Sequence, residues 1–206
     1  MGTTPKKPLW IIGIDEVGRG PLAGPVTVCA VAMKYALYEK RAWPGLTDSK
    51  KLSAKRREVW CQTAKDLEKK GMLRIVVISE TAKQIDDKGV AVCIRSCIAK
   101  ALIQLECDPR STLVLLDGGL KAPSIYTNQQ TIIRGDQSKQ IISMASVIAK
   151  VTRDAYMTRI AKKYPGYDLA QNKGYGTHFH QKALKNLGFT SLHRKSFLSR
   201  ILDNKS

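Results

Sequence analysis

The sequence predicts an α/β domain that carries a basic C-terminal extension. Three observations lead to this class. Short runs rich in β-branched residues come first along the chain, later runs alternate with stretches of helical apolar spacing, and 206 residues are enough for one substantial core. We expect the domain to span residues 1–166. The basic helical extension, residues 167–206, is expected to pack on the same domain.

The strands are predicted from short apolar runs that turn residues separate. The first two runs are joined by a Gly/Pro-rich turn, which favours neighbouring strands. With three later runs, strands are expected at residues 9–14, 26–33, 73–78, 113–116 and 130–133.

Four segments have the features of helices. Ser53 is a candidate N-cap for a helix that ends before Gly71. Residues 90–106 and 139–163 carry apolar residues at helical spacing, and the second segment is expected to pack on the sheet. A last helix is predicted at residues 178–187, in the polar and basic part of the chain.

The charge of the chain indicates a polyanionic partner. Thirty-five Lys and Arg residues against seventeen Asp and Glu give a formal net charge of +18. Residues 134–206 alone hold fourteen basic and four acidic residues, so this part is expected to contact phosphates.

The cysteines favour a reducing compartment. All five are scattered in apolar surroundings without paired CxxC motifs, which is typical of reduced core thiols and not of a zinc site. The apolar run near the N-terminus has only six residues, fewer than a signal segment or a membrane span needs. We therefore expect a cytoplasmic protein that does not bind membranes.

Acidic residues at the ends of predicted strands suggest a metal site. Carboxylates repel phosphate, so a phosphate-binding protein is expected to have them nearby only where a bound divalent cation lies between the two. Such oxygens, converging on one sheet edge, suit Mg²⁺ or Mn²⁺. Because consecutive strand residues point to opposite faces, two adjacent acids can share a cation only where the strand ends or twists. The acids concerned are Asp15, Glu16, Asp117 and Asp136.

A glycine-rich segment, Gly18, Arg19 and Gly20, follows the first two acids. Glycines let backbone groups approach a sugar or phosphate closely. The stretch superficially echoes a nucleotide-binding P-loop. It lacks the terminal Gly-Lys-Ser/Thr, however, and places two acids where a phosphate would lie, so we reject that interpretation.

Residues 13–26, GIDEVGRGPLAGPV, resemble the signature of the bacterial ribonuclease HII family. The resemblance extends over almost the whole chain. Further matching segments are residues 48–53 (DSKKLS), 116–118 (LDG), 135–136 (GD), 145–154 (ASVIAKVTRD), 173–177 (KGYGT) and 193–197 (HRKSF). Two departures occur: Arg134 replaces the usual lysine, and no proline follows Phe197, which leaves the path of the tail open.

The resemblance implies a ribonuclease H-like fold, a mixed five-stranded sheet flanked by helices. It implies an endonuclease that hydrolyses the RNA strand of RNA–DNA hybrids and cuts 5′ to ribonucleotides embedded in duplex DNA. The products would carry 5′-phosphate and 3′-hydroxyl ends. Such an enzyme removes ribonucleotides and RNA primers from DNA, uses Mg²⁺ or Mn²⁺, and is expected to be a monomer. Contact with a replication clamp is left open.

The same resemblance implies roles for individual residues. The four acids named above become the catalytic metal ligands. The Gly18-Arg19-Gly20 loop would contact the ribose 2′-OH, which distinguishes RNA from DNA. Nucleic-acid contacts are also implied for Lys50 and Lys51, at phosphates, and for Tyr175, at the sugar on the DNA side of an RNA–DNA junction.

Other residues are interpreted as non-catalytic. His178 and His180 do not share a helix face and are expected at the surface or in contact with phosphate. Asp154 is expected to orient Arg153 or a neighbouring basic group.

Three rival functions are less well supported. The Gly-Arg-Gly and tyrosine loops argue against a DNA-cutting resolvase or transposase core. The short stretch before the first strand argues against the type 3 enzyme with its N-terminal substrate-binding domain. Acids that repel phosphate argue against a non-enzymatic nucleic-acid-binding protein.

Overall fold

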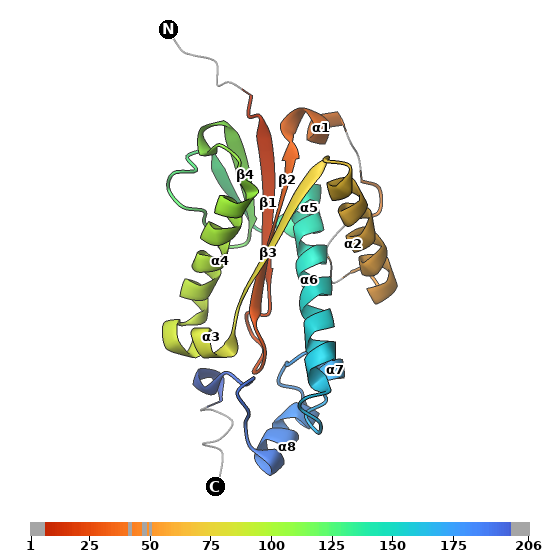
Figure 1. The fold of residues 1–206 in the computed structure, drawn as a ribbon, viewed down its shortest axis with the longest axis vertical. Helices are drawn as coiled ribbons and strands as arrows, with labels where there is room; N and C mark the ends of the chain where they lie inside the picture. The colour runs from red at the N-terminus through yellow and green to blue at the C-terminus, as the bar shows by residue number, and fades with distance from the viewer. Residues whose placement is uncertain (1–6, 41–42, 47–48, 50, 199–206) are drawn as a thin grey trace.

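The structure is a computed structural model that describes residues 7–40, 43–46, 49 and 51–198. Its centre is a five-stranded sheet in the order β3-β2-β1-β4-β5 (Figure 1). The strands are β1 Trp10–Val17, β2 Val26–Lys34, β3 Leu73–Glu80, β4 Thr112–Asp117 and β5 Gln129–Ile132. The pairs β1–β2 and β2–β3 are antiparallel, whereas β1–β4 and β4–β5 are parallel. The predicted mixed five-stranded sheet is therefore confirmed.

Helices cover both faces of this sheet. On one face α4 contacts β2 and β3, and on the other α6 contacts β1 and β2, with α2 packed beside it (Figure 1). The helices are α1 Tyr35–Lys40, α2 Ala54–Lys69, α3 Ala82–Lys88, α4 Val90–Leu105, α5 Gly135–Ser138, α6 Gln140–Ala161, α7 Leu169–Asn172 and α8 His178–Leu187. Two short 3₁₀ helices lie at Pro109–Ser111 and Lys195–Phe197.

The central strand β1 feeds two separate cores because its side chains alternate between the faces. Ile12 and Ile14 are fully buried in the core under α4. Ile11 is buried in the core under α2 and α6. These three isoleucines thus anchor β1 on both sides of the sheet just before Asp15 and Glu16.

The start of α6 lies against the backbone of β1. A Cβ atom added at Gly13 would lie 2.5 Å from the carbonyl carbon and oxygen of Ile141, a separation that real Cβ atoms do not show. Only glycine fits here. This close approach sets the N-terminal half of α6 next to the end of β1 that carries the first two acids.

The strands and the long helices agree with the sequence, and the shortest helices were not predicted. Ser53 caps α2, since its hydroxyl accepts a hydrogen bond from the Arg56 backbone N–H at 3.3 Å. By contrast, α1, α3, α5 and α7 have only four to seven residues each. Segments of one or two turns are too short to show a helical apolar period.

The segment that follows α6 packs on a third, smaller core. Tyr167, Leu184 and Leu192 are buried there against Met157 of α6 and against Leu22, which follows β1. The C-terminal segment therefore contacts the loop that leaves β1. The proposed division between residues 166 and 167 stays a prediction.

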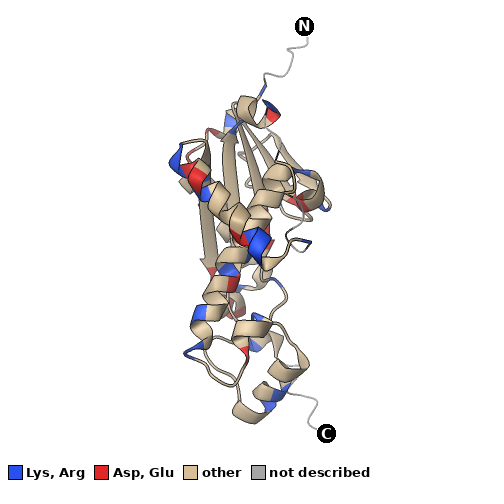
Figure 2. Ribbon diagram, turned by 90° about the vertical axis from the view of Figure 1, so that its right-hand side faces the viewer, with Lys and Arg blue, Asp and Glu red and all other residues tan. Residues whose placement is uncertain are grey.

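All five cysteines are free and buried, as expected of core thiols. Lys and Arg occur along the whole length of the ribbon, the C-terminal helices included (Figure 2). Among the described residues, no helix has the length and apolar character that crossing a membrane would require.

Candidate active site

The acids of β1 and β4 meet because these two strands run parallel. The register pairs Ile14 with Leu116, so the next residues along each strand, Asp15 and Asp117, lie side by side at the same edge of the sheet. Glu16 follows Asp15 within β1, which extends to Val17. The register therefore agrees with the expectation that the acids at the strand ends lie together at one edge of the sheet.

The last acid reaches the site through a sharp turn. Arg134 adopts a left-handed conformation, with φ of 54°, and starts the four-residue helix α5. The backbone N–H of Asp136 then donates to Asp117 Oδ1 at 3.3 Å. A Cβ at Gly135 would lie only 2.6 Å from Ile142 Cδ1, so glycine lets this turn approach the start of α6.

All four acids line one pocket of about 280 Å³. Asp15 and Asp136 are buried, while Glu16 and Asp117 are partly exposed. The other lining residues are Val17, Ser49, Ser146, Lys150 and Tyr175. The side chains of Asp15 and Glu16 thus line the same pocket although they are adjacent in a strand, the point on which strand alternation had raised a doubt.

The surroundings of Asp15 and Glu16 disfavour the ionised form of both carboxyl groups. Burial, together with the nearby charges of Glu16 and Asp117, raises the pKa of Asp15 to about 8, although hydrogen bonds from Ser146 and the Glu16 N–H lower it. Burial also raises the pKa of Glu16, and the Arg19 guanidinium counteracts that shift. A divalent cation would offset this repulsion.

The donors fit Mg²⁺ or Mn²⁺, because four carboxylates supply hard oxygen ligands. In the part of the chain that the structure describes, no three His, Cys, Asp or Glu side chains already form a closed ligand group.

Comparisons with known proteins agree with this geometry. Residues 12–200 match the ribonuclease HII family. The chain belongs to this family. A ribonuclease HII of Synechococcus sp. (strain CC9902) is 44% identical over 200 residues, which cover 93% of this chain and 94% of the relative.

Two solved structures have a similar fold. One is the PCNA:RNase HII complex from Archaeoglobus fulgidus, with a TM-score of 0.72, 24% identity and coverage of 91% of this chain and 94% of that chain. The other is Bst-RNase HIII in complex with Mn²⁺, with a TM-score of 0.68, 16% identity and coverage of 96% and 70%. These similarities confirm the predicted ribonuclease H-like fold.

Membership of the ribonuclease HII family also confirms the predicted class of activity. The chain is a metal-dependent endoribonuclease that acts on RNA in RNA–DNA hybrids. The structure shows where each predicted site residue lies relative to the pocket of acids.

Two of the predicted recognition segments of this ribonuclease HII family member lie at the pocket. Tyr175 lines it and remains 42% exposed, with its ring centroid 6.0 Å from Lys150 Nζ. The Gly18-Arg19-Gly20 loop lies beside it, since Arg19 Nη1 is 3.5 Å from Glu16 Oε1. Both segments therefore border the pocket of acids.

Of the two lysines predicted to contact phosphate, the structure describes only one. Lys51 is exposed and does not line it. Lys50 lies outside the described residues. Ser49, from the same segment, does line the pocket, and its hydroxyl is 2.8 Å from the hydroxyl of Ser146. The roles of Lys50 and Lys51 stay predictions.

Sequence reasoning gave no role to Lys150 and Ser146, which line the pocket from α6. They lie four residues apart, so they share one face of the helix. Lys150 also pairs with Asp154 at 3.0 Å, so Asp154 orients a neighbouring basic group, one of the two predicted alternatives. The four-residue spacing of Ser146, Lys150 and Asp154 was the signal that could have identified this face.

The expectation for His180 was wrong. It is fully buried instead of lying at the surface, and its Nε2 is 3.1 Å from Nε2 of His193. Its Nδ1 is 2.8 Å from the backbone carbonyl oxygen of Tyr175. The sequence did not reveal this because His193 lies thirteen residues away, outside the helix. His178 is exposed, as expected.

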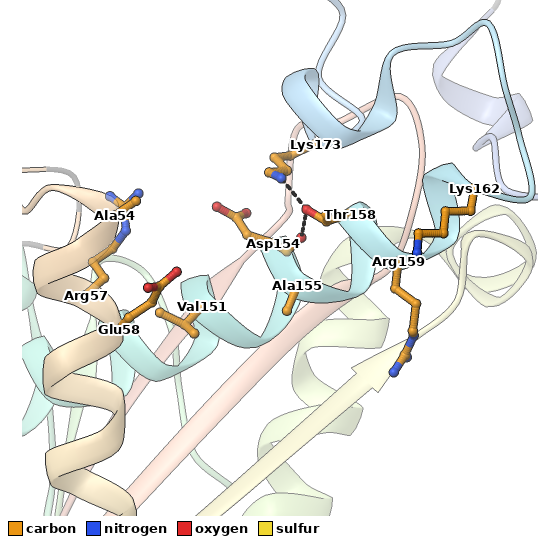
Figure 3. A pocket seen from close by; sticks show the side chains of 10 residues that line it. All are labelled: Ala54, Arg57, Glu58, Val151, Asp154, Ala155, Thr158, Arg159, Lys162 and Lys173. Atoms are coloured by element: carbon orange, nitrogen blue, oxygen red, sulfur yellow. Dashed lines mark hydrogen bonds between the residues drawn. The ribbon is translucent and has the colours of Figure 1, made fainter.

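A larger pocket of about 500 Å³ lies between α2 and α6, away from the four acids (Figure 3). Its charged lining is mixed, and the Lys173 ammonium group donates to the hydroxyl of Thr158. The charged residues are Arg57, Glu58, Asp154, Arg159, Lys162 and Lys173. This pocket has no group of carboxylates comparable to that beside Asp15, so the smaller pocket is the candidate active site.

Proposed function

We propose that Asp15, Glu16, Asp117 and Asp136 bind the catalytic divalent cations, Mg²⁺ or Mn²⁺, of this ribonuclease HII family member. One observation carries the proposal: all four carboxylates line one pocket, where burial and mutual repulsion raise the pKa of Asp15 to about 8. A bound divalent cation would offset the repulsion between these carboxylates, and their oxygen donors suit both metals.

The bound cations would supply a nucleophilic water near neutral pH and stabilise the developing charge on the phosphate. The residues of this chain hold and orient the reactants. Lys150 offers a cation at the pocket wall, and its ion pair with Asp154 restricts its side chain. The hydroxyl of Ser146 hydrogen bonds to Asp15 and so keeps that carboxylate turned into the site.

Recognition of the substrate is proposed for the segments beside the pocket. Gly18, Arg19 and Gly20 would contact the ribose 2′-OH, and Tyr175 would pack on the sugar at the RNA–DNA junction. Lys50 and Lys51 would contact phosphates of the duplex. With these contacts the enzyme cuts 5′ to a ribonucleotide embedded in DNA and leaves 5′-phosphate and 3′-hydroxyl ends.

We expect a cytoplasmic monomer that removes ribonucleotides and RNA primers from DNA. The Archaeoglobus fulgidus relative forms a complex with PCNA. A binding assay with a purified replication clamp would test whether this chain makes a similar contact.

A calorimetric titration with Mn²⁺ tests the metal assignment apart from cleavage. The wild type should bind the cation, and Asp15→Asn should weaken binding by about tenfold or more, because one ligand loses its charge. Asp87→Asn is the matched control: Asp87 is an exposed acid that pairs with Lys83 and does not line the pocket. Equal affinities for all three proteins would contradict the proposal.

A further inference from the structure

Two arginines are among the largest fully buried side chains of the protein. Arg153 of α6 is 1% exposed, and Arg194, which precedes the last 3₁₀ helix, is 0% exposed. Among the ion pairs of the described residues, none includes either arginine. Burying a guanidinium without a carboxylate is unfavourable unless other acceptors replace water.

Backbone carbonyls replace water around Arg194. Its Nε donates to the carbonyl oxygen of Gly24 at 3.0 Å, Nη1 to that of Arg19 at 3.0 Å, and Nη2 to that of Gly18 at 2.6 Å. One side chain therefore joins both ends of the loop that leaves β1. The loop lies 170 or more residues earlier in the chain.

Arg153 makes an equivalent set of bonds to two loops. Its Nε donates to the carbonyl oxygen of Pro25 at 2.9 Å, Nη2 to that of Ala23 at 3.2 Å, and Nη1 to that of Lys173 at 2.9 Å. Its guanidinium carbon also lies 5.9 Å from the ring centroid of Tyr175. Arg153 thus links the loop after β1 to the segment that carries Tyr175.

The loops are shaped to accept these two cations. Gly18 has φ of 88°, and a Cβ there would lie 2.3 Å from Arg153 Nε, so the arginine and the glycine backbone are in direct contact. Burial lowers the pKa of Arg194, assisted by the nearby charge of Arg153, to about 10. Two like charges are therefore held close together and away from water, with carbonyl dipoles as their main compensation.

The segments that the arginines hold adjoin the pocket of acids. Gly18 and Arg19 come directly after the end of β1, and Arg19 contacts Glu16. Lys173 comes two residues before Tyr175, which lines the pocket. The two segments are also joined directly, since the backbone N–H of Leu22 donates to the carbonyl oxygen of Gly174 at 2.8 Å.

We propose that Arg194 and Arg153 are positioning residues that fix the Gly18-Arg19-Gly20 loop against the Tyr175 segment and thereby set the preference for a ribonucleotide at the cleaved position. Neither arginine touches the substrate. Each acts through the carbonyls it binds: Arg194 holds Gly18 and Arg19 directly, and Arg153 holds residues that flank the two segments, Ala23, Pro25 and Lys173. The inference rests on the proposed role of the loop at the 2′-OH.

Arg194→Lys is the variant that separates positioning from charge. Lysine keeps the positive charge but presents its donors from one point, so it cannot reproduce a planar guanidinium that bonds to three separate carbonyls. We expect the single-turnover rate on a duplex with one ribonucleotide to fall about 10- to 100-fold, because a displacement near 1 Å at a reacting centre has effects of this size. Binding of the duplex and of Mn²⁺ should change little.

The decisive readout is the ratio of the cleavage rates for a ribonucleotide and for its 2′-fluoro analogue at the same position. The analogue lacks the hydroxyl donor that the loop would bind. A displaced loop should lower the ratio by about tenfold. Loss of folded protein would lower both rates alike and leave the ratio unchanged. Leu102→Val, buried under the opposite face of the sheet, is the matched destabilised control and should keep the wild-type ratio.

Arg153→Lys provides a second test should Arg194→Lys fail to fold, and we expect the same loss in the ratio. A wild-type ratio in the folded variants would overturn the inference. Failure of both variants to fold would also overturn it, because the arginines would then serve the fold alone. A wild type that shows no preference for the ribonucleotide would instead contradict the proposed function.

Discussion

Two neighbouring regions at the C-terminal end of β1 differ in how their buried charges are compensated. In the acid pocket, carboxylates lie next to one another, and burial raises the pKa of both Asp15 and Glu16. Around Arg153 and Arg194, each guanidinium makes three hydrogen bonds to backbone carbonyls. The neighbouring acids repel one another and would be stabilised by a cation from solution, whereas the arginines are compensated by carbonyls of the chain itself.

This difference separates two tasks. Under the proposed function the acid pocket would act only with a bound cation, so its properties should depend on metal and on the charge of each acid. The two arginines and His180 hydrogen bond to backbone carbonyls of the loops beside the pocket, and His193 contacts His180. Substitutions at these residues should therefore displace the loops without abolishing metal binding.

The largest effect is expected for Asp117→Asn, which keeps the shape of the side chain and removes one charge. Cleavage should fall by about 10³-fold or more, since metal stabilisation of the transition state contributes several kcal/mol. Hybrid binding should persist and tighten slightly, because one source of repulsion is lost. Single-turnover cleavage and a filter-binding assay measure the two effects. Near wild-type cleavage at saturating Mg²⁺ would show that Asp117 does not bind the metal.

A smaller loss is expected for Tyr175→Ala, which removes a ring at the pocket wall but no acid. On a duplex with one ribonucleotide, we expect a loss on the order of 100-fold, in turnover more than in binding. Tyr175→Phe keeps the ring and should lose less. A Mn²⁺ titration should give the same affinity for all three proteins. Equal cleavage rates would exclude a role for Tyr175 and leave selection to the Gly18-Arg19-Gly20 loop.

The histidine pair should make stability depend on pH. Hydrogen bonds assign the tautomers: His180 Nδ1–H donates to the Tyr175 carbonyl, and His193 Nδ1 accepts from the Thr190 N–H at 3.0 Å, so His193 Nε2–H donates to His180. Protonating either ring would place two N–H groups against each other. Burial and the neighbouring His180 lower the pKa of His193 from 6.5 to about 4, and burial lowers that of His180.

The sign follows from proton uptake. Between pH 6.5 and about 4 the unfolded chain binds a proton at His193 that the folded chain does not, so the free energy of unfolding is full above pH 6.5 and declines as the pH falls to 4. The loss should be about 2 to 3 kcal/mol. Denaturant unfolding across this range should show a flatter profile for His193→Gln, with the exposed His178→Gln as control. A wild-type profile for His193→Gln would show that the pair does not titrate in this way.

The smallest effect is expected when Lys50 and Lys51 both become alanine. Each lost phosphate contact should lower the slope of log affinity against log salt by about 0.9, alike for all duplexes. Cleavage at saturating substrate should change little, since Lys51 does not line the pocket. An unchanged slope would place both lysines outside the interface.

The acid pocket could be predicted from the sequence, and the contacts of the buried arginines and histidines could not. Asp15, Glu16 and Asp117 sit at the ends of apolar runs, and parallel strands bring such ends together whatever the rest of the fold does. Arg194 binds carbonyls of residues 18, 19 and 24, contacts that leave no local pattern because backbone acceptors occur in every residue. The buried pairing of His180 with His193 likewise depends on the path of the chain between them.

The dependence of cleavage on added cation tests the central claim most directly. Wild-type protein is incubated with duplex DNA that holds one ribonucleotide, in a chelator alone and in increasing Mg²⁺ or Mn²⁺, and the position of the cut is mapped. We expect no cut in the chelator, and a single cut 5′ to the ribonucleotide once the cation is present. Cleavage in the chelator, or no cleavage at saturating Mg²⁺ and Mn²⁺, would contradict the assignment of the four carboxylates as a metal-dependent active site.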